Sequence, residues 1–132
     1  SVRKSDRLPA VEIARKLAEL GFTLYATRGT ASALSKAGLE VVSVNKVKEG
    51  RPHIVDMIKN GEINLIINTV GDKRSAVQDS YSIRHAVLQA RVTYFTTLAG
   101  ARAACIGMAN IRELKVYDLQ KLHKLIKSEL SH

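Results

Sequence analysis

Four residues, Thr27-Arg-Gly-Thr30, carry the clearest chemical signal in the sequence. They follow a short run of residues that favour β-strands, at 22–26, and precede apolar residues at helical spacing. The pattern therefore predicts a junction between a strand and a helix. At such a junction, free backbone N–H groups and the positive end of the helix dipole can bind a phosphate. Gly29 permits close approach of the backbone, and both threonine hydroxyls can donate to phosphate oxygens. The alternative is structural, with Thr30 capping the helix and Gly29 making the turn.

Two cations and an amide are expected at the same edge of the sheet. Lys46 and Arg51 follow the predicted strand at 41–44, where they could close over an anion without a metal. The alternative is that both are solvated loop cations. Asn68 and Thr69 directly follow a buried apolar run. The Asn68 amide suits a pyrimidine edge, a ribose hydroxyl or a structural bond to a neighbouring loop. In parallel sheets, ligands bind at the carboxyl ends of the strands, where these residues are expected.

Catalytic and metal-binding patterns are weak. Cys105 lies on an apolar helix face, which favours packing over reactivity. Asp72 and Asp79 are the carboxylates near the predicted site, and neither is paired with a second acid for acid–base chemistry. The sequence therefore predicts no catalytic residue and no metal ligand. This prediction also rests on the four histidines, because their spacing does not match that of metal ligands. They are His53, His85, His123 and His132.

The elements that position these residues alternate between two apolar periods. Strands are expected at 22–26, 41–44, 63–67, 92–95 and 114–117. Helices are expected around 10–20, 31–36, 53–59, 83–90, 98–108 and 119–130, with Asp79 or Ser80 capping the fourth helix and Asp118 the last. This alternation predicts an α/β domain over residues 1–132: three layers, doubly wound, with helices on both faces of a mostly parallel five-stranded sheet.

Composition restricts the class of partner. The chain of 132 residues is 45% hydrophobic and 25% charged, which is ordinary for one folded domain, and no apolar run is long enough to span a membrane. A single cysteine excludes an internal disulfide and favours a reducing, cytoplasmic setting. The net charge of +9 suggests an anionic partner, although a solvated basic surface explains it equally well. Interleaved charges and few aromatic residues disfavour nucleic acid.

Three segments resemble the methylglyoxal-synthase-like (MGS-like) domain family: 21–31 (GFTLYATRGTA), 44–53 (VNKVKEGRPH) and 66–69 (IINT). The second is specific to one branch, the C-terminal allosteric domains of carbamoyl phosphate synthetase large subunits, and residues 82–84 and 96–98 also fit it. The resemblance extends over residues 1–127. It implies a doubly wound parallel sheet, in which the family's first strand would precede Ser1 and Val2, so that at most its end is retained here.

Carried over residue by residue, the resemblance implies that Thr27, Thr30 and Lys46 bind a phosphate. Arg7 stands where the family pattern has a lysine, which keeps the charge and changes its geometry. Asn68 matches an asparagine that contacts uracil or ribose, whereas Val70 replaces a threonine and loses a hydroxyl contact. The residues expected to bind a nucleotide are Arg7, Thr27, Gly29, Thr30, Lys46, Arg51, Asn68 and Thr69.

The resemblance also implies a function. The implied function is that of a regulatory domain that binds UMP or IMP and is not itself an enzyme. Such a domain forms the C-terminus of a larger glutamine-dependent synthetase of pyrimidine and arginine biosynthesis. Expected partners are the remainder of the large subunit, its glutaminase small subunit and a second copy of the chain, with no nucleic acid and no membrane. The domain itself needs no cofactor, whereas the parent enzyme would use ATP, Mg²⁺ and K⁺ elsewhere.

The alternative is a lyase of the methylglyoxal synthase type that acts on dihydroxyacetone phosphate. That enzyme uses an aspartate base in the loop that here reads Glu-Gly-Arg-Pro-His, and Arg51 stands in its place. A cation cannot abstract a proton, so the substitution disfavours lyase activity.

Overall fold

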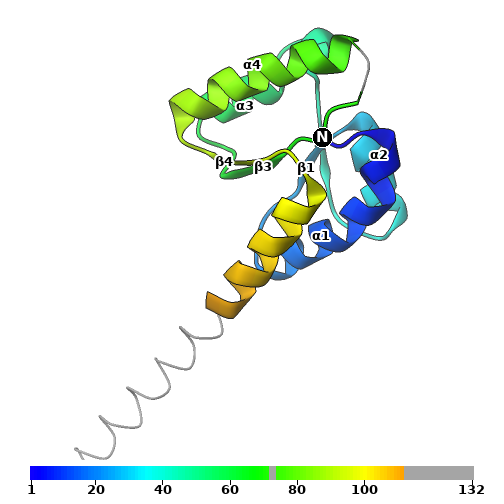
Figure 1. Ribbon diagram of the computed structural model, residues 1–132. Coiled ribbons are helices and arrows are strands. Elements are labelled where there is room, and N and C mark those ends of the chain that lie inside the picture. Colours follow the sequence, from blue (N-terminus) through cyan, green and yellow to red (C-terminus); the bar gives the residue numbers. More distant parts are fainter. Residues whose placement is uncertain (72–73, 112–132) are drawn as a thin grey trace, which may run out of the picture.

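Helices and strands alternate along the chain in the computed structural model, which describes residues 1–71 and 74–111 (Figure 1). The strand expected at 114–117 and the helix expected at 119–130 lie outside the described residues. In chain order, the elements are η1 (Lys4–Asp6), α1 (Arg7–Glu19), β1 (Tyr25–Thr27), α2 (Arg28–Lys36), β2 (Val42–Val44), η2 (Val47–Glu49), α3 (Ile54–Lys59), β3 (Leu65–Ile67), α4 (Arg74–Ala90), β4 (Thr93–Phe95) and a helix over 98–111.

Helices α1 and α2 end where the sequence predicts. Pro9 lies in the first turn of α1, where its missing N–H leaves no intrahelical bond unmade. Gly21 follows Leu20, the C-cap residue of that helix, with φ +95°, in the left-handed region that glycine adopts without a Cβ clash. Gly38 ends α2 in the same way, with φ +85°. These stops fix where the chain turns back towards the next strand.

Helix α4 begins at Arg74, so the prediction of a cap at Asp79 or Ser80 is wrong. Ser80 is buried, and it lies on the same helix face as Ile83 and Val87, three and seven residues further along. The buried stripe therefore runs through Ser80 instead of starting after it. Because Ser80 is polar, the apolar residues of the first two turns of α4 do not show a helical spacing in the sequence.

The four strands form two parallel pairs. β1 pairs with β2, with Tyr25 opposite Val42, and β3 pairs with β4, with Leu65 opposite Thr93. Parallel strands joined through helices confirm the doubly wound α/β class. The single five-stranded sheet is not found among the described residues, because no ladder joins the two pairs.

Ser1 lies beside β3 and makes the two backbone hydrogen bonds that are typical of a parallel strand. Its amine donates to the Ile67 carbonyl (3.0 Å), and the Thr69 N–H donates to the Ser1 carbonyl (3.1 Å). The first residue of the chain therefore occupies a strand position between the two pairs.

Helices cover both faces of the strands. In Figure 1, α3 and α4 lie on one side of the strands, and α1, α2 and the helix 98–111 lie on the other. Ile58 and Ile83 belong to the cluster beneath α3 and α4. On the opposite face, Ile13 packs with Cys105, which confirms Cys105 as a core residue, and burial raises the pKa of its thiol. Among the described residues, none of the helices is long and apolar enough to cross a membrane.

Candidate functional site

The junction of β1 and α2 forms the centre of the candidate site. Thr27 is both the last residue of the strand and the N-cap residue of the helix, with an extended backbone (φ −67°, ψ 159°). Thr27 and Thr30 are buried, with 4% and 6% of their surface exposed. The first turn of α2 contains no acidic side chain, so its positive end is not neutralised from within the helix.

The Thr30 hydroxyl is engaged by the N-terminal segment instead of by its own helix. It accepts a hydrogen bond from the Val2 N–H (3.2 Å). Thr30 is the third residue of α2 and not its N-cap, so the alternative in which it only caps the helix is wrong. A hydroxyl that accepts one bond keeps its own hydrogen for another partner.

Gly29 makes room for a cation. A Cβ added at this position would lie 2.6 Å from Arg7 Cζ and 3.2 Å from Arg7 Nη1, so the guanidinium packs against the first turn of α2 only because residue 29 is glycine. Gly29 lies within the helix and does not make the predicted turn. The Arg7 Nε is buried and has no hydrogen-bond partner, which costs stability unless a ligand supplies an acceptor.

Lys46 is tied to the same helix through Glu49. The Glu49 carboxylate accepts a bond from the Lys46 N–H (2.8 Å) and pairs with Arg28 Nε (3.3 Å), the first residue of α2. Burial, followed by the nearby charge of Lys46, lowers the pKa of the Ser1 amine from 8.0 to about 6. Lys46 therefore lies close enough to the N-terminal segment for its positive charge to act on the Ser1 amine.

Asn68 and Thr69 complete the site from the end of β3. Asn68 is buried, and its Nδ2 donates to the Tyr94 hydroxyl on β4 (3.1 Å), which leaves its Oδ1 as an acceptor. The Thr69 hydroxyl accepts a bond from the Arg3 N–H (2.8 Å). The Asn68 amide therefore makes a structural bond, but to the neighbouring strand β4 and not to a neighbouring loop as predicted.

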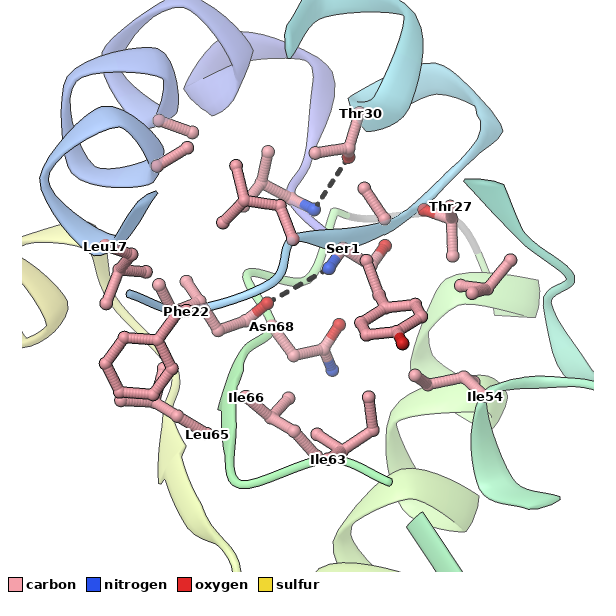
Figure 2. A pocket seen from close by; sticks show the side chains of 18 of the residues that line it. Ser1, Leu17, Phe22, Thr27, Thr30, Ile54, Ile63, Leu65, Ile66 and Asn68 are labelled. Carbon is pink, nitrogen blue, oxygen red and sulfur yellow. Dashed lines mark hydrogen bonds between the residues drawn. The ribbon is translucent and has the colours of Figure 1, made fainter. Parts of the chain in front are cut away.

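Five of the predicted residues line one cavity of about 580 Å³ between β1 and β3. Figure 2 shows three of them, Thr27, Thr30 and Asn68, in this cavity. Its walls are mostly apolar and include Ile13 and Ile66, and its acidic lining residue within the described chain is Glu62. Glu62 precedes β3 and therefore lies at the edge opposite the carboxyl ends of the strands. The five are Thr27, Thr30, Lys46, Asn68 and Thr69.

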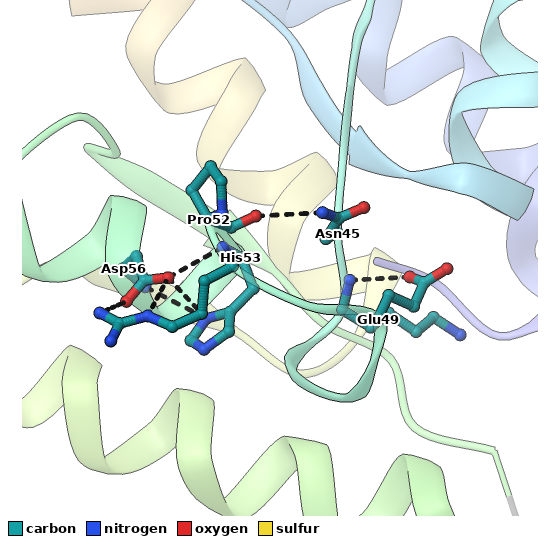
Figure 3. A network of polar contacts seen from close by, with 7 residues as sticks. Asn45, Glu49, Pro52, His53 and Asp56 are labelled. Atoms are coloured by element: carbon teal, nitrogen blue, oxygen red, sulfur yellow. Dashed lines mark hydrogen bonds and ion pairs between the residues drawn. The ribbon is translucent and has the colours of Figure 1, made fainter.

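Arg51 lies apart from this group. Its side chain is 80% exposed, and its guanidinium holds Asp56 with Nη2–Oδ1 at 2.6 Å and Nε–Oδ2 at 3.2 Å (Figure 3). Asp56 also accepts a bond from the N–H of His53, the N-cap residue of α3 (3.0 Å). The Arg51 bond and this backbone bond lower the pKa of Asp56 to about 2. The cluster therefore stabilises the start of α3.

Sequence reasoning missed the backbone of Val2 and Arg3 and the hydroxyl of Tyr94. The amides of Val2 and Arg3 bond two site hydroxyls, but backbone groups have no residue-type signature. Tyr94 follows the alternation of β4, and that pattern could have placed its side chain on the face of the buried Asn68. Within the described residues, no group of three or more histidine, cysteine or acidic side chains is arranged to hold a metal.

Comparison with known proteins assigns the family. The MGS-like domain model matches residues 9–96, two-thirds of the chain. The chain belongs to the MGS-like domain family. It is similar to the carbamoyl phosphate synthase large chain of Ralstonia nicotianae (58% identity over 93% of this chain), of Halomonas eurihalina (51% over 93%) and of Pseudomonas aeruginosa (49% over 97%).

The matched region is a small part of each relative. This MGS-like domain spans 11% of the Ralstonia and Halomonas chains and 12% of the Pseudomonas chain, in the C-terminal region of these relatives. Its α/β architecture of helices and parallel strands agrees with the family assignment.

Proposed function

We propose that this domain is the allosteric regulatory domain of a glutamine-dependent carbamoyl phosphate synthetase large chain, and that it binds a nucleoside monophosphate such as UMP or IMP through the phosphate. The convergence of donors at one edge of the strands carries the proposal. Thr27, Thr30, Thr69 and Lys46 come from three separate segments and line one cavity. Arg7 lies over the helix turn between the first two of them.

The phosphate supplies most of the affinity in this proposal, because its negative charge matches Arg7, Lys46 and the positive end of α2. The base supplies selectivity. Asn68 presents Oδ1 as an acceptor while Tyr94 holds its amide nitrogen, an arrangement that favours a base or ribose with a hydrogen-bond donor. A uracil N3–H is such a donor.

The same geometry disfavours catalysis. Among the described residues from β2 through α3, the Glu49 carboxylate is bonded to the Lys46 backbone and paired with Arg28, and Asp56, apart from the cavity, is held by Arg51 with a pKa of about 2. A carboxylate with so low a pKa is a weak base. The domain therefore acts by differential binding to two arrangements of the larger chain, for which coupling energies of about 1–3 kcal/mol are typical.

The wider context of the proposal is a large cytoplasmic enzyme of pyrimidine and arginine biosynthesis. The remainder of the large chain and a glutaminase small subunit are the proposed partners, with a second copy of the chain as a further contact. ATP, Mg²⁺ and K⁺ are proposed to act elsewhere in that enzyme, so the domain itself binds the effector alone. Support comes from the relatives described above, which are carbamoyl phosphate synthase large chains.

A pair of lysine variants tests the site. Lys46→Met removes a cation that lines the cavity, whereas Lys48→Met removes one that lies nearby and bonds Gln78 (3.3 Å). A hydrogen bond to a charged group contributes about 1.5–3 kcal/mol, so Lys46→Met should weaken UMP binding by roughly 10- to 150-fold in calorimetry. Lys48→Met should bind as the unaltered chain does. Equal affinities in both variants would remove Lys46 from the site.

A ligand panel tests the class of effector. UMP and IMP should bind saturably, and uridine, which lacks the phosphate, should bind far more weakly. Failure of every monophosphate to bind would overturn the proposed function. A parallel assay with dihydroxyacetone phosphate tests the lyase alternative, and release of methylglyoxal and phosphate by the purified chain would favour an enzyme.

A further inference from the structure

The first three residues of the chain link the two sides of the candidate site through their backbone. Ser1 is bonded to β3 through Ile67, and the Arg3 N–H donates to the Thr69 hydroxyl beyond that strand (2.8 Å). Between them, the Val2 N–H points the other way and donates to the Thr30 hydroxyl on α2 (3.2 Å). The segment thus bonds to the end of β3 on one side and to α2, the helix that follows β1, on the other, where the predicted phosphate ligands lie.

These two bonds determine what the threonine hydroxyls can offer a ligand. Thr30 and Thr69 are 6% and 4% exposed, so neither hydroxyl can rely on water. A threonine oxygen that accepts a backbone N–H is left with one hydrogen to donate. Both hydroxyls are therefore set as donors towards the cavity they line, which suits an anion.

Resting on the proposed function, we propose that the Val2 and Arg3 amides form a backbone clamp that positions the Thr30 and Thr69 hydroxyls for the phosphate. The clamp makes the N-terminal segment the coupling element between the bound effector and any chain that precedes Ser1. Binding of the anion holds the segment in place, and an anchored segment holds the hydroxyls for the anion. Thermodynamic linkage makes the two effects equal in size.

The cavity shows how a preceding segment would be anchored. Ser1 pairs with β3 in a parallel ladder, and in such a ladder the next bonding position is two residues earlier, opposite Ile66. A residue there would donate to the Leu65 carbonyl and accept from the Ile67 N–H. Apolar side chains of α1 and of β3 line the cavity on either side, including Ile13 and Ile66, so an apolar strand continuing from Ser1 fits between them and leaves the polar edge at Thr30 and Thr69 to the ligand.

A proline substitution isolates the clamp. Arg3 has φ −59°, which matches the φ of proline, so Arg3→Pro removes the N–H with little backbone strain. Arg3→Ala is the matched control, because both variants lose the ion pair with Asp6 and only the proline loses the bond to Thr69. We expect UMP to bind Arg3→Pro at least fivefold more weakly than Arg3→Ala by calorimetry, while the two melting temperatures stay close.

A double-mutant cycle protects this test against a fold defect. In a Thr69→Val background the bond is already lost, so the proline and alanine variants should bind UMP equally. A proline effect that persists in that background overturns the clamp, as does equal binding of the two variants in the unaltered chain. Failure of the unaltered chain to bind any monophosphate overturns the proposed function instead.

Two N-terminal extensions test the coupling. A four-residue extension, Val-Ile-Val-Leu, can add a strand, whereas Val-Pro-Val-Pro has the same length and cannot donate the ladder bonds. With the first, hydrogen exchange at the Ile67 amide should slow at least tenfold and UMP should bind at least fivefold more tightly. Asn68, already bonded to the Phe95 carbonyl, is the internal control. Equal UMP affinity in the two extended chains refutes the coupling, and equal Ile67 exchange refutes the strand.

Discussion

Substitution of Gly29 by alanine should separate folding stability from ligand binding. Gly29 is the second residue of α2, and its φ is not positive, so alanine fits the helical backbone. Alanine favours helix over glycine by up to about 1 kcal/mol, and an effect of that size raises the melting temperature of a domain this long by a few degrees. The new Cβ would lie 2.6 Å from Arg7 Cζ, and the flexible guanidinium must move away.

The displaced guanidinium should then be lost to the ligand. A charge-assisted bond to phosphate contributes about 1.5–3 kcal/mol, which corresponds to a roughly 10- to 150-fold weaker UMP affinity. Calorimetry measures both the affinity and the melting temperature. Gly107→Ala is the matched control, because Gly107 lies in the helix 98–111 and an added Cβ there meets nothing within 4 Å. If Gly29→Ala bound UMP as tightly as Gly107→Ala, Arg7 would not be a phosphate ligand.

Three further predictions concern stability. In the domain studied as an isolated chain, the Ser1 amine has a pKa of about 6 when folded and 8.0 as its ordinary value, so the unfolded state binds more protons between these two pH values. The free energy of unfolding of the isolated domain should therefore rise by up to about 3 kcal/mol from pH 6 to pH 8 in urea titrations, and N-terminal acetylation should abolish the rise. Ile58→Ala removes a fully buried side chain of α3 and should lower the free energy of unfolding by about 2–5 kcal/mol in denaturant titrations. Arg51→Met should raise the pKa of Asp56 from about 2 towards 3.8. Because this carboxylate stabilises the fold only while it is ionised, the variant should begin to unfold at a higher pH than the unaltered chain when acid unfolding is monitored by circular dichroism.

The architecture could be predicted from the sequence where local signals and burial agree. Pro9 and Gly21 bracket α1, and the apolar spacing of that helix matches its buried face. The polar residues after β1 and β3 fall at the carboxyl ends of parallel strands, and this fold rule places them at a common edge without knowledge of any contact. Helix α4 escaped prediction at its start, because Ser80 is a polar residue in a buried stripe.

The partner that each charged side chain takes in the fold could not be predicted. Arg51 and Lys46 have the same sequence signature, two cations in one loop, but Asp56 holds Arg51 on the surface while Glu49 ties the Lys46 backbone to α2. Which carboxylate engages which neighbour depends on where α3 begins. The function of Gly29 is equally a property of the folded chain, since only the position of Arg7 shows what its missing side chain makes room for.

The net charge of +9 is a poor guide to the site, and the pairing of individual cations is a better one. Arg3, Arg28 and Arg51 each face a carboxylate within 3.3 Å, so their charges are balanced locally. Within the described residues, Arg7 and Lys46 have no ion-pair partner. The Nε of Arg7 is buried without a hydrogen-bond partner, and Lys46 lines the cavity. An unbalanced cation next to buried hydroxyls is unfavourable in the empty domain and favourable once an anion binds. In the proposed function, selectivity for a phosphorylated ligand therefore depends on the cations that the fold leaves unpaired beside the cavity, and not on how many cations the sequence contains.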